Sequence, residues 1–244
     1  MGHLPVNRRL NLRAEIKRIK EDPLKRYLAA AYPKTELGGT RSKYEDAYYL
    51  YTKAMERALE QVSVLVRYRK GPHYVRKYGG SYGPRQKQLA EKWRKLHPFT
   101  GLDINTCILQ TRILLDRTIG LSRAFLSGSR LPSFTSFNDH KKFFVRNPNA
   151  LSRHKEYARY IVNKTDWFDT PLKVIRDKFI VHSGPKHVKA LSIGWESDDL
   201  SLDVFILEPK MSKSVDINIW RLSYDIESFL KWFAKYGLLS MNKK

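Results

Sequence analysis

Three residues in the C-terminal half of the chain carry side chains suited to cleaving a phosphodiester. Arg176 is followed directly by Asp177, and His182 lies six positions after the arginine. An imidazole with an unperturbed pKa near about 6.5 exchanges protons at neutral pH, so it can act as a general acid or base. A guanidinium can hold a phosphate and stabilise the charge that develops on it. RNA supplies its own nucleophile, the 2′-hydroxyl, so this chemistry requires no metal.

The spacing of these residues limits how they can meet. Six helical residues separate Arg176 from His182 by about 120° around the axis, so the two side chains do not share one face. The arginine must reach around the helix, the helix must end near His182, or a second subunit must complete the site. Residues 183–185 are Ser-Gly-Pro, which favours a helix end at this point. Lys178 precedes His182 by four residues, so it shares that face and can contact a phosphate.

The segment VIRDKFIVHSGP, at residues 174–185, resembles the signature of the HEPN family of ribonucleases. In that family an arginine, usually followed by a polar residue, precedes a histidine after four to six intervening residues. The polar residue is commonly Asn, and Asp177 is a recurring variant. The apolar triplet at residues 179–181 also resembles the family. The resemblance is strong over residues 171–184 and holds at the level of architecture over residues 102–236.

The resemblance implies a metal-independent endoribonuclease that uses no cofactor and leaves a 2′,3′-cyclic phosphate. His182 would transfer the proton, Arg176 would hold the scissile phosphate, and Asp177 would orient one of these two. HEPN domains generally dimerise and place both motifs in one cleft, so a homodimer is expected. A role in phage defence or a toxin–antitoxin setting, with an antitoxin or regulatory partner, is also expected. The alternative is a non-catalytic RNA- or partner-binding HEPN-like helical protein.

The charge of the chain supports RNA as the partner. Lys and Arg number 46 against 24 Asp and Glu, a net charge of +22, which favours a polyanion. Nucleic acid comes first and an acidic membrane surface second, because the basic residues are dispersed rather than confined to one amphipathic helix. A solvated basic surface, or one that docks on an acidic protein, is the plainer alternative.

A second candidate binding region lies at residues 67–95, where ten Lys or Arg accompany one acid, Glu91. Four tyrosines are interleaved with these cations, and their rings can stack on unpaired bases. The glycines and prolines between residues 71 and 84 predict a loop, so Arg76, Lys77 and Tyr78 are expected to bind RNA from it. A solvated loop with packed tyrosines is the alternative. Arg112, four residues before Asp116, predicts an exposed pair and a weaker RNA contact.

The elements that must position these residues are mainly helical. Periodic apolar residues predict helices at about 10–31, broken at Pro23, and at 42–69, 85–96, 103–127, 151–164, 171–182 and 216–236. Thr170 and Pro171 are expected to start the helix that carries the motif, and Gly237 to end the last one. The expected fold is an HEPN-like helical bundle with a small β-hairpin at about 190–207, inserted before the C-terminal helix.

Two regions follow from this division: a basic helical N-terminal region at residues 1–100, which includes the Tyr/Gly-rich stretch, and an HEPN-like domain at residues 101–244. Cys107 is the single cysteine, so no disulfide forms within the chain and a reducing compartment is expected. The cysteine lies among apolar residues and is expected to be buried. No apolar run approaches the length of a bilayer span, so we expect a cytoplasmic protein without a membrane partner.

Overall fold

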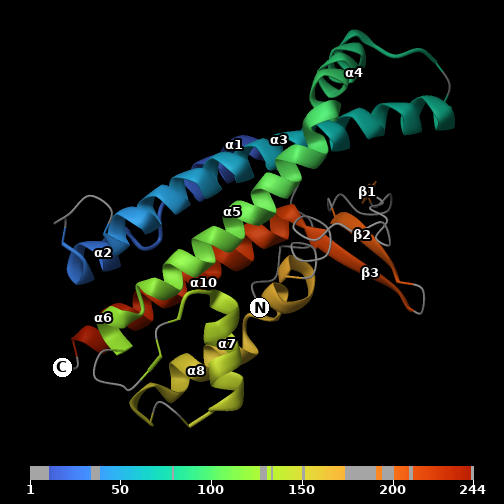
Figure 1. Ribbon diagram of the computed structural model, residues 1–244. Helices are drawn as coiled ribbons and strands as arrows, with labels where there is room; N and C mark the ends of the chain where they lie inside the picture. The colour runs from blue at the N-terminus through green and yellow to red at the C-terminus, as the bar shows by residue number, and fades with distance from the viewer. Residues whose placement is uncertain are drawn as a thin grey trace.

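The computed structural model describes residues 11–33, 39–78, 80–126, 131–132, 134–149, 152–173, 191–193, 201–208 and 211–242. Over these residues the chain is mainly helical, which confirms the expected helical bundle. The elements are α1 (Leu12–Lys20), α2 (Lys25–Ala31), α3 (Thr40–Tyr78), α4 (Pro84–Leu96), η1 (His97–Phe99), α5 (Thr100–Gly120), α6 (Arg123–Leu126), α7 (Phe137–Arg146), η2 (Ser152–His154), α8 (Lys155–Asn163), η3 (Phe168–Leu172), β1 (Leu191–Ile193), β2 (Ser201–Glu208), β3 (Met211–Asn218) and α10 (Ile219–Met241) (Figure 1).

The long helices α3 and α5 pack against each other in antiparallel directions. Thr40, at the start of α3, lies beside Gly120 at the end of α5. Further along, the sulfur atoms of Met55 and Cys107 are 3.8 Å apart. A single buried cluster then joins these two helices to α1, α2, α6, α7, α8 and α10. The core is therefore shared by the first 100 residues and the rest of the chain.

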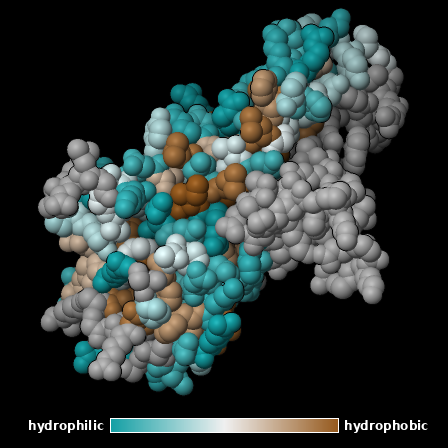
Figure 2. All heavy atoms as spheres, in the orientation of Figure 1, coloured by the Kyte–Doolittle hydropathy of each residue, from teal (hydrophilic) through white to brown (hydrophobic). Residues whose placement is uncertain are grey.

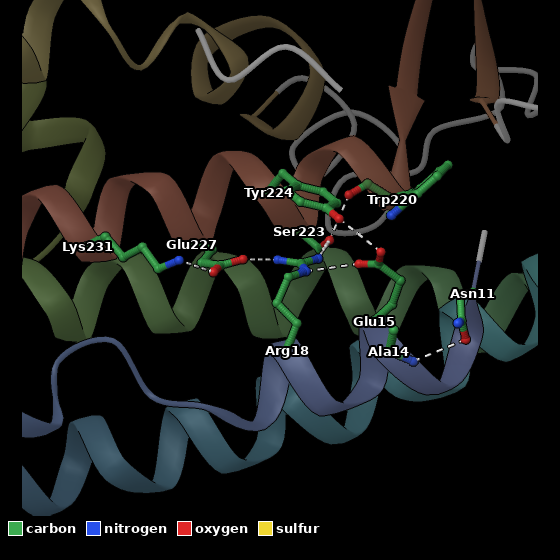
Figure 3. Close-up of polar contacts among 9 residues, drawn as sticks. All are labelled: Asn11, Ala14, Glu15, Arg18, Trp220, Ser223, Tyr224, Glu227 and Lys231. Atoms are coloured by element: carbon green, nitrogen blue, oxygen red, sulfur yellow. Dashed lines mark hydrogen bonds and ion pairs between the residues drawn. The ribbon is translucent and has the colours of Figure 1, made fainter. Parts of the chain in front are cut away.

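A polar network fastens α1 to α10 (Figure 3). The Arg18 guanidinium donates from Nε to Glu15 at 2.9 Å, from one terminal nitrogen to Glu227, and from the other to the Ser223 hydroxyl at 2.6 Å. Its Cζ atom also lies 3.7 Å from the centroid of the Tyr224 ring, whose hydroxyl donates to Glu15. Every nitrogen of this half-buried guanidinium thus has a partner, which fixes the angle between the two helices.

The break predicted at Pro23 is confirmed. Helix α1 ends at Lys20 and α2 begins at Lys25. Between them, the Asp22 carboxylate accepts from the Leu24 backbone N–H at 2.8 Å and from the Tyr44 hydroxyl at 2.9 Å. Asp22 therefore both shapes this short connection and holds it against α3.

The loop expected between residues 71 and 84 is wrong over most of its length. Helix α3 continues to Tyr78, and α4 begins at Pro84 after a short turn. Proline disfavours helical geometry in the preceding residue partly by a clash with its Cβ atom, and that residue is Gly71, which has none. The glycine preceding the proline thus lets the helix pass through a position that normally ends one. In the turn, Gly80 has a φ of +100°, which favours glycine.

Helix α7 was not expected from the sequence. The Ser136 hydroxyl accepts from the Asp139 backbone N–H at 3.1 Å, which caps the helix at its first turn. A serine followed three residues later by an acid is a usable start signal, but the Ser- and Pro-containing sequence before it favours a loop. The helix contributes Phe137 and Phe144 to the core.

Three other helix ends differ from expectation. The helix expected from residue 103 begins earlier, at Thr100, and Asp103 binds the Arg57 guanidinium at 2.8 Å. Helix α10 starts at Ile219, where the Asn218 side chain accepts from the Arg221 backbone N–H at 2.8 Å. It runs through Gly237 to Met241, so that glycine is not the expected stop.

The strands precede α10 and form an antiparallel sheet in the order β1-β2-β3. Leu191 pairs with Val204, and Glu208 pairs with Met211 across the connection between β2 and β3. The third strand occupies residues 211–218, which were assigned from the sequence to a connection and the first residues of the last helix. No helix in the described part of the chain has both the length and the apolar character to cross a membrane.

Candidate functional site

The residues expected to perform catalysis, Arg176, Asp177 and His182, lie outside the described residues, as does Lys178. The description reaches Lys173, three positions before the arginine, and resumes at Leu191. What can be built from the structure is the platform that leads into the motif, which consists of residues 165–173 and the side chains that hold them.

The platform is helical from residue 166 onward and contains a π-helical turn, η3, at Phe168–Leu172. The Thr165 hydroxyl donates to the Ile161 carbonyl at 2.6 Å, and the Phe168 N–H donates to the Thr165 carbonyl at 3.0 Å. The helical turns thus begin before Thr170 and Pro171, so the start expected at those two residues is wrong. Turns of the π type are rare and occur frequently at functional sites.

Two side chains of the platform are fully buried and anchor it to the bundle. Phe168 and Leu172 both have 0% exposure. The Phe168 ring centroid lies 4.6 Å from that of Phe137 on α7, and the Trp167 ring packs against Phe229 on α10. The last described residues before the motif are therefore held by two different helices.

A buried cation on α7 holds the other side of the platform. Lys141 is only 5% exposed, and its Nζ lies 2.5 Å from an Asp169 carboxylate oxygen and 3.9 Å from one of Asp166. The same ammonium donates to the Thr165 carbonyl at 3.1 Å. A buried ammonium needs such partners, because burial without them is costly. Lys141 thereby fixes the backbone at the start of the platform.

Arg112 on α5 contacts the platform from a third direction. Its Cζ atom lies 4.5 Å from the centroid of the Phe168 ring, and its Nε lies 3.4 Å from an Asp116 oxygen. Asp116 also accepts from the Phe137 N–H at 2.7 Å, which ties α5 to the first residue of α7. The pairing of Arg112 with Asp116 is as expected, but its exposure is not, since Arg112 is only 5% exposed. Its described contacts fit a positioning role better than a phosphate contact at the surface.

Burial keeps the histidine on α7, His140, in its neutral form. His140 is fully buried, and its Nε2 lies 2.8 Å from the Tyr157 hydroxyl. Burial lowers the pKa of His140 to about 3. The cysteine is equally unreactive, because burial raises the pKa of the Cys107 thiol to about 12. The expectation that Cys107 is a buried apolar residue is confirmed.

The remaining binding candidates lie at the far end of α3. Arg76, Lys77 and Tyr78 form its last turn, and the structure describes their backbone. They were expected on a loop and are placed on a helix instead. Among the described residues, no group of three His, Cys, Asp or Glu side chains is arranged to hold a metal ion.

Sequence reasoning missed Lys141 and Phe168 as parts of the site. Lys141 lies in a stretch where no helix was expected, and a lysine between basic and aromatic neighbours is ordinarily exposed. The Ser136 cap signal was the one available clue, because it places a helix over this residue. The burial of Phe168 could be expected from its apolar side chain, but its position beneath Arg112 depends on tertiary packing.

In comparisons with known proteins, the chain matches no family model, no curated protein and no solved structure.

Proposed function

We propose that this protein is a metal-independent endoribonuclease of the HEPN type. The observation that carries the proposal is the motif itself, in which Arg176 and Asp177 precede His182 in an apolar context before a Ser-Gly-Pro terminator. In the reaction, a general base removes the proton from the 2′-hydroxyl, whose oxygen attacks the adjacent phosphorus. The bond from phosphorus to the 5′-oxygen breaks, and that oxygen is protonated. The products carry a 2′,3′-cyclic phosphate and a 5′-hydroxyl.

Each motif residue has a role that its chemistry permits. His182 exchanges the proton, as base toward the 2′-hydroxyl or as acid toward the leaving oxygen. Arg176 holds the phosphate and stabilises the negative charge of the transition state. Asp177 is unsuited to face a phosphate, so it orients Arg176 or His182. Lys178 adds a backbone phosphate contact.

The described platform supports this proposal by supplying a rigid base for the motif. Catalytic geometry must be held closely, since misplacement of a reacting group by about 1 Å can lower the rate on the order of 10²-fold. Lys173 lies three residues before Arg176 and directly follows the buried Leu172. Elements of α5, α7 and α10 all contact the residues that lead into the motif.

A homodimer completes the proposed site. If the helix expected from the sequence runs through the motif, Arg176 and His182 would be about 120° apart around its axis, and one subunit alone would bring them together with difficulty. Two copies related by a twofold axis can present both motifs to one phosphodiester. Light scattering that shows a monomer at the concentrations where the protein cleaves RNA would remove the twofold site from this proposal.

The decisive experiment is cleavage of end-labelled RNA in EDTA, followed by analysis of the fragment ends. The wild-type protein should produce cyclic phosphate ends, and both His182→Ala and Arg176→Ala should abolish cleavage while keeping the helical circular dichroism signal. His97→Ala and Arg159→Ala remove an exposed histidine and an exposed arginine elsewhere, so they serve as matched controls. Full activity of His182→Ala would end the proposal.

A non-catalytic RNA-binding protein is the second candidate. The observation that favours it is the net charge of +22, which requires no catalytic residue. Under this alternative the wild-type protein would retain RNA in a binding assay and leave it intact over long incubation. The same EDTA experiment therefore separates the two candidates.

A further inference from the structure

One part of the molecule extends beyond the shared core, and we refer to it as the α3–α4 arm. It consists of residues 67–78 of α3, the turn at residues 80–83, and α4 (Figure 1). The last buried residue identified on α3 is Leu65, and α4 contributes no buried residue although all of it is described. Helix α4 therefore adds little to the core, and its surface is available for another task.

The arm is held in a fixed shape. The Gln86 side-chain nitrogen donates to the Tyr68 carbonyl at 2.6 Å, which ties the start of α4 to α3. Near the other end of α4, Lys92 binds Glu60 at 2.7 Å. At the base, the Gln61 side chain donates to the Leu96 carbonyl at 3.1 Å and to Asp103 at 2.8 Å. These bonds hold α4 antiparallel to α3, so its side chains have a fixed spacing.

The exposed charge of the arm is positive. Arg67, Arg85, Lys87 and Arg94 are all exposed, and none forms an ion pair with a residue that the structure describes. The acids beside them are already occupied, since Glu91 binds Lys95 at 3.0 Å and Glu60 binds Lys92. Figure 2 shows hydrophilic residues over α4. The five cations of α4 thus share a single acid on their own helix, Glu91, so the helix keeps an excess of exposed positive charge.

The spacing of these cations follows from the helix. Arg85 and Arg94 lie about 13.5 Å apart along the axis of α4, because each residue adds about 1.5 Å. Lys87 and Arg94 are seven residues apart and share a face. At the base of the arm, Arg67 lines a shallow hollow together with Asn11, Leu12, Arg13 and Ile16. Positive charge therefore continues from the arm onto α1.

We propose that the α3–α4 arm binds the phosphate backbone of double-helical RNA. A duplex carries a dense, regularly spaced array of phosphates, and rigidly held cations match such an array better than they match a flexible strand. Residues 71–78 form part of helix α3 and not the flexible loop expected from the sequence, so they are less able to adapt their backbone to unpaired bases. The one tryptophan of α4, Trp93, is half-buried, and its ring packs edge-on against His97 with centroids 4.9 Å apart. Its ring is therefore less available to stack on an unpaired base, which favours a duplex over a single strand.

If the arm binds duplex RNA, double-helical RNA is the substrate class of the proposed nuclease. This inference therefore rests on the proposed function. The duplex is held by charge along the arm and is not read for its sequence. The cut is made elsewhere, by the motif. Folded RNA, in which a duplex lies beside an unpaired segment, is the substrate that this division of labour fits.

The test compares two triple variants that each remove three positive charges. The arm variant carries Arg85→Gln, Lys87→Gln and Arg94→Gln. The control carries Lys25→Gln, Arg26→Gln and Lys43→Gln, which are exposed residues of α2 and the first turn of α3, at the opposite end of α3 from the arm (Figure 1). Both are made in the full chain with His182→Ala, so that cleavage does not interfere with binding. Fluorescence anisotropy then measures affinity for a blunt RNA duplex and for a single strand across a range of salt.

The arm variant should bind the duplex about tenfold or more weakly, and its salt dependence should flatten by about 0.9 per lost phosphate contact. The control should stay within about twofold of the parent chain. Equal losses in both triple variants would show that the charge acts diffusely and would overturn the proposal. Tighter binding of the single strand, abolished by replacing the exposed Tyr82 with Ala, would overturn it in favour of base stacking. Because binding is measured in an inactive chain, failure here leaves the cleavage experiment with an intact arm as a separate test.

Discussion

The guanidinium of Arg112 lies over the ring of Phe168, with its Cζ atom 4.5 Å from the ring centroid. Both residues are buried, one on α5 and the other in the π-helical turn that precedes the motif. A cation held over an aromatic ring away from water contributes on the order of 2 kcal/mol. This contact therefore couples the packing of the bundle to the position of the proposed catalytic residues.

Replacing Phe168 with Leu should lower both the stability of the fold and the rate of cleavage. Leucine keeps most of the buried volume but removes the aromatic face beneath Arg112, so the unfolding free energy should fall by about 2–3 kcal/mol. Metal-free cleavage should fall by at least about tenfold, because the platform that precedes the motif is no longer fixed. Thermal unfolding and the EDTA cleavage assay measure the two effects.

Phe144→Leu is the matched control for that variant. Phe144 is a buried phenylalanine of α7 whose ring contacts His140 and Tyr157 instead of the platform. It should lose a similar amount of stability and keep its cleavage rate. Equal losses of cleavage in the two variants would mean that the platform acts only through general stability.

Removing the cation of the α1–α10 network should destabilise the fold. Arg18→Met keeps the length of the side chain but leaves Glu15 and Glu227 without their common partner, and both carboxylates are largely buried. We expect a loss of about 2–3 kcal/mol in unfolding free energy, below the range for a fully buried pair because the site is partly solvated. Lys95→Met breaks the exposed pair with Glu91 and should leave the unfolding free energy nearly unchanged, because water and salt screen that pair. Urea titrations of both variants check this contrast.

Two helical glycines should respond in opposite ways to alanine. A Cβ atom at Gly237 would lie 2.5 Å from the Tyr27 ring and 3.1 Å from that of Phe125. The Tyr27 ring cannot easily move, because its hydroxyl donates to the Leu121 carbonyl at 2.6 Å. Gly237→Ala should therefore destabilise the protein by about 1–3 kcal/mol despite the better helix propensity of alanine.

Gly120 provides the comparison within the same bundle. A Cβ atom there would lie 3.7 Å from the Thr40 side chain, an ordinary contact. Gly120→Ala should stabilise the protein by about 0.5–1 kcal/mol, because the unfolded chain loses conformational freedom. If denaturation measured side by side showed that Gly237→Ala and Gly120→Ala shift the unfolding midpoint in the same direction, the close approach of α10 to Tyr27 would be contradicted.

Sequence periodicity predicted most helices because the apolar side of each faces one core. The buried Tyr and Ala residues that recur at helical spacing along α3, and the break at Pro23, can both be recognised from the local sequence. The helical course through Pro72 is eased by the preceding glycine, and the Gln86 side chain bonds the Tyr68 carbonyl that Pro72 cannot. The packing role of Gly237 depends on Tyr27, which lies far away in the sequence. Local rules therefore located the helices but misplaced several of their ends.

The candidate site divides in the same way. The motif is a sequence feature, and its chemistry follows from the residue types. The platform is a tertiary feature, because Arg112, Lys141 and Phe168 come from separate elements. Burial of Arg112 was unpredictable from its helix alone, since pairing with Asp116 four residues later is typical of an exposed helix face. Only the packing of α7 and η3 against α5 reveals why a cation is buried there.

His140 should make the fold sensitive to acid. Its pKa in the folded protein is about 3, because burial disfavours the charged imidazolium, whereas an unfolded chain has a histidine pKa of about 6.5. Above the unfolded pKa the histidine is neutral in both states and leaves stability unchanged. As the pH falls from about 6.5 toward about 3, the unfolded state binds a proton that the folded state does not, and stability decreases by up to about 1.4 kcal/mol per pH unit. His140→Gln removes this proton while keeping a group that can bond the Tyr157 hydroxyl, so its loss of stability between pH 6.5 and pH 4 should be smaller than that of the wild type. Urea unfolding across that range measures the difference, and parallel pH profiles for the two proteins would mean that this imidazole is protonated in the folded state.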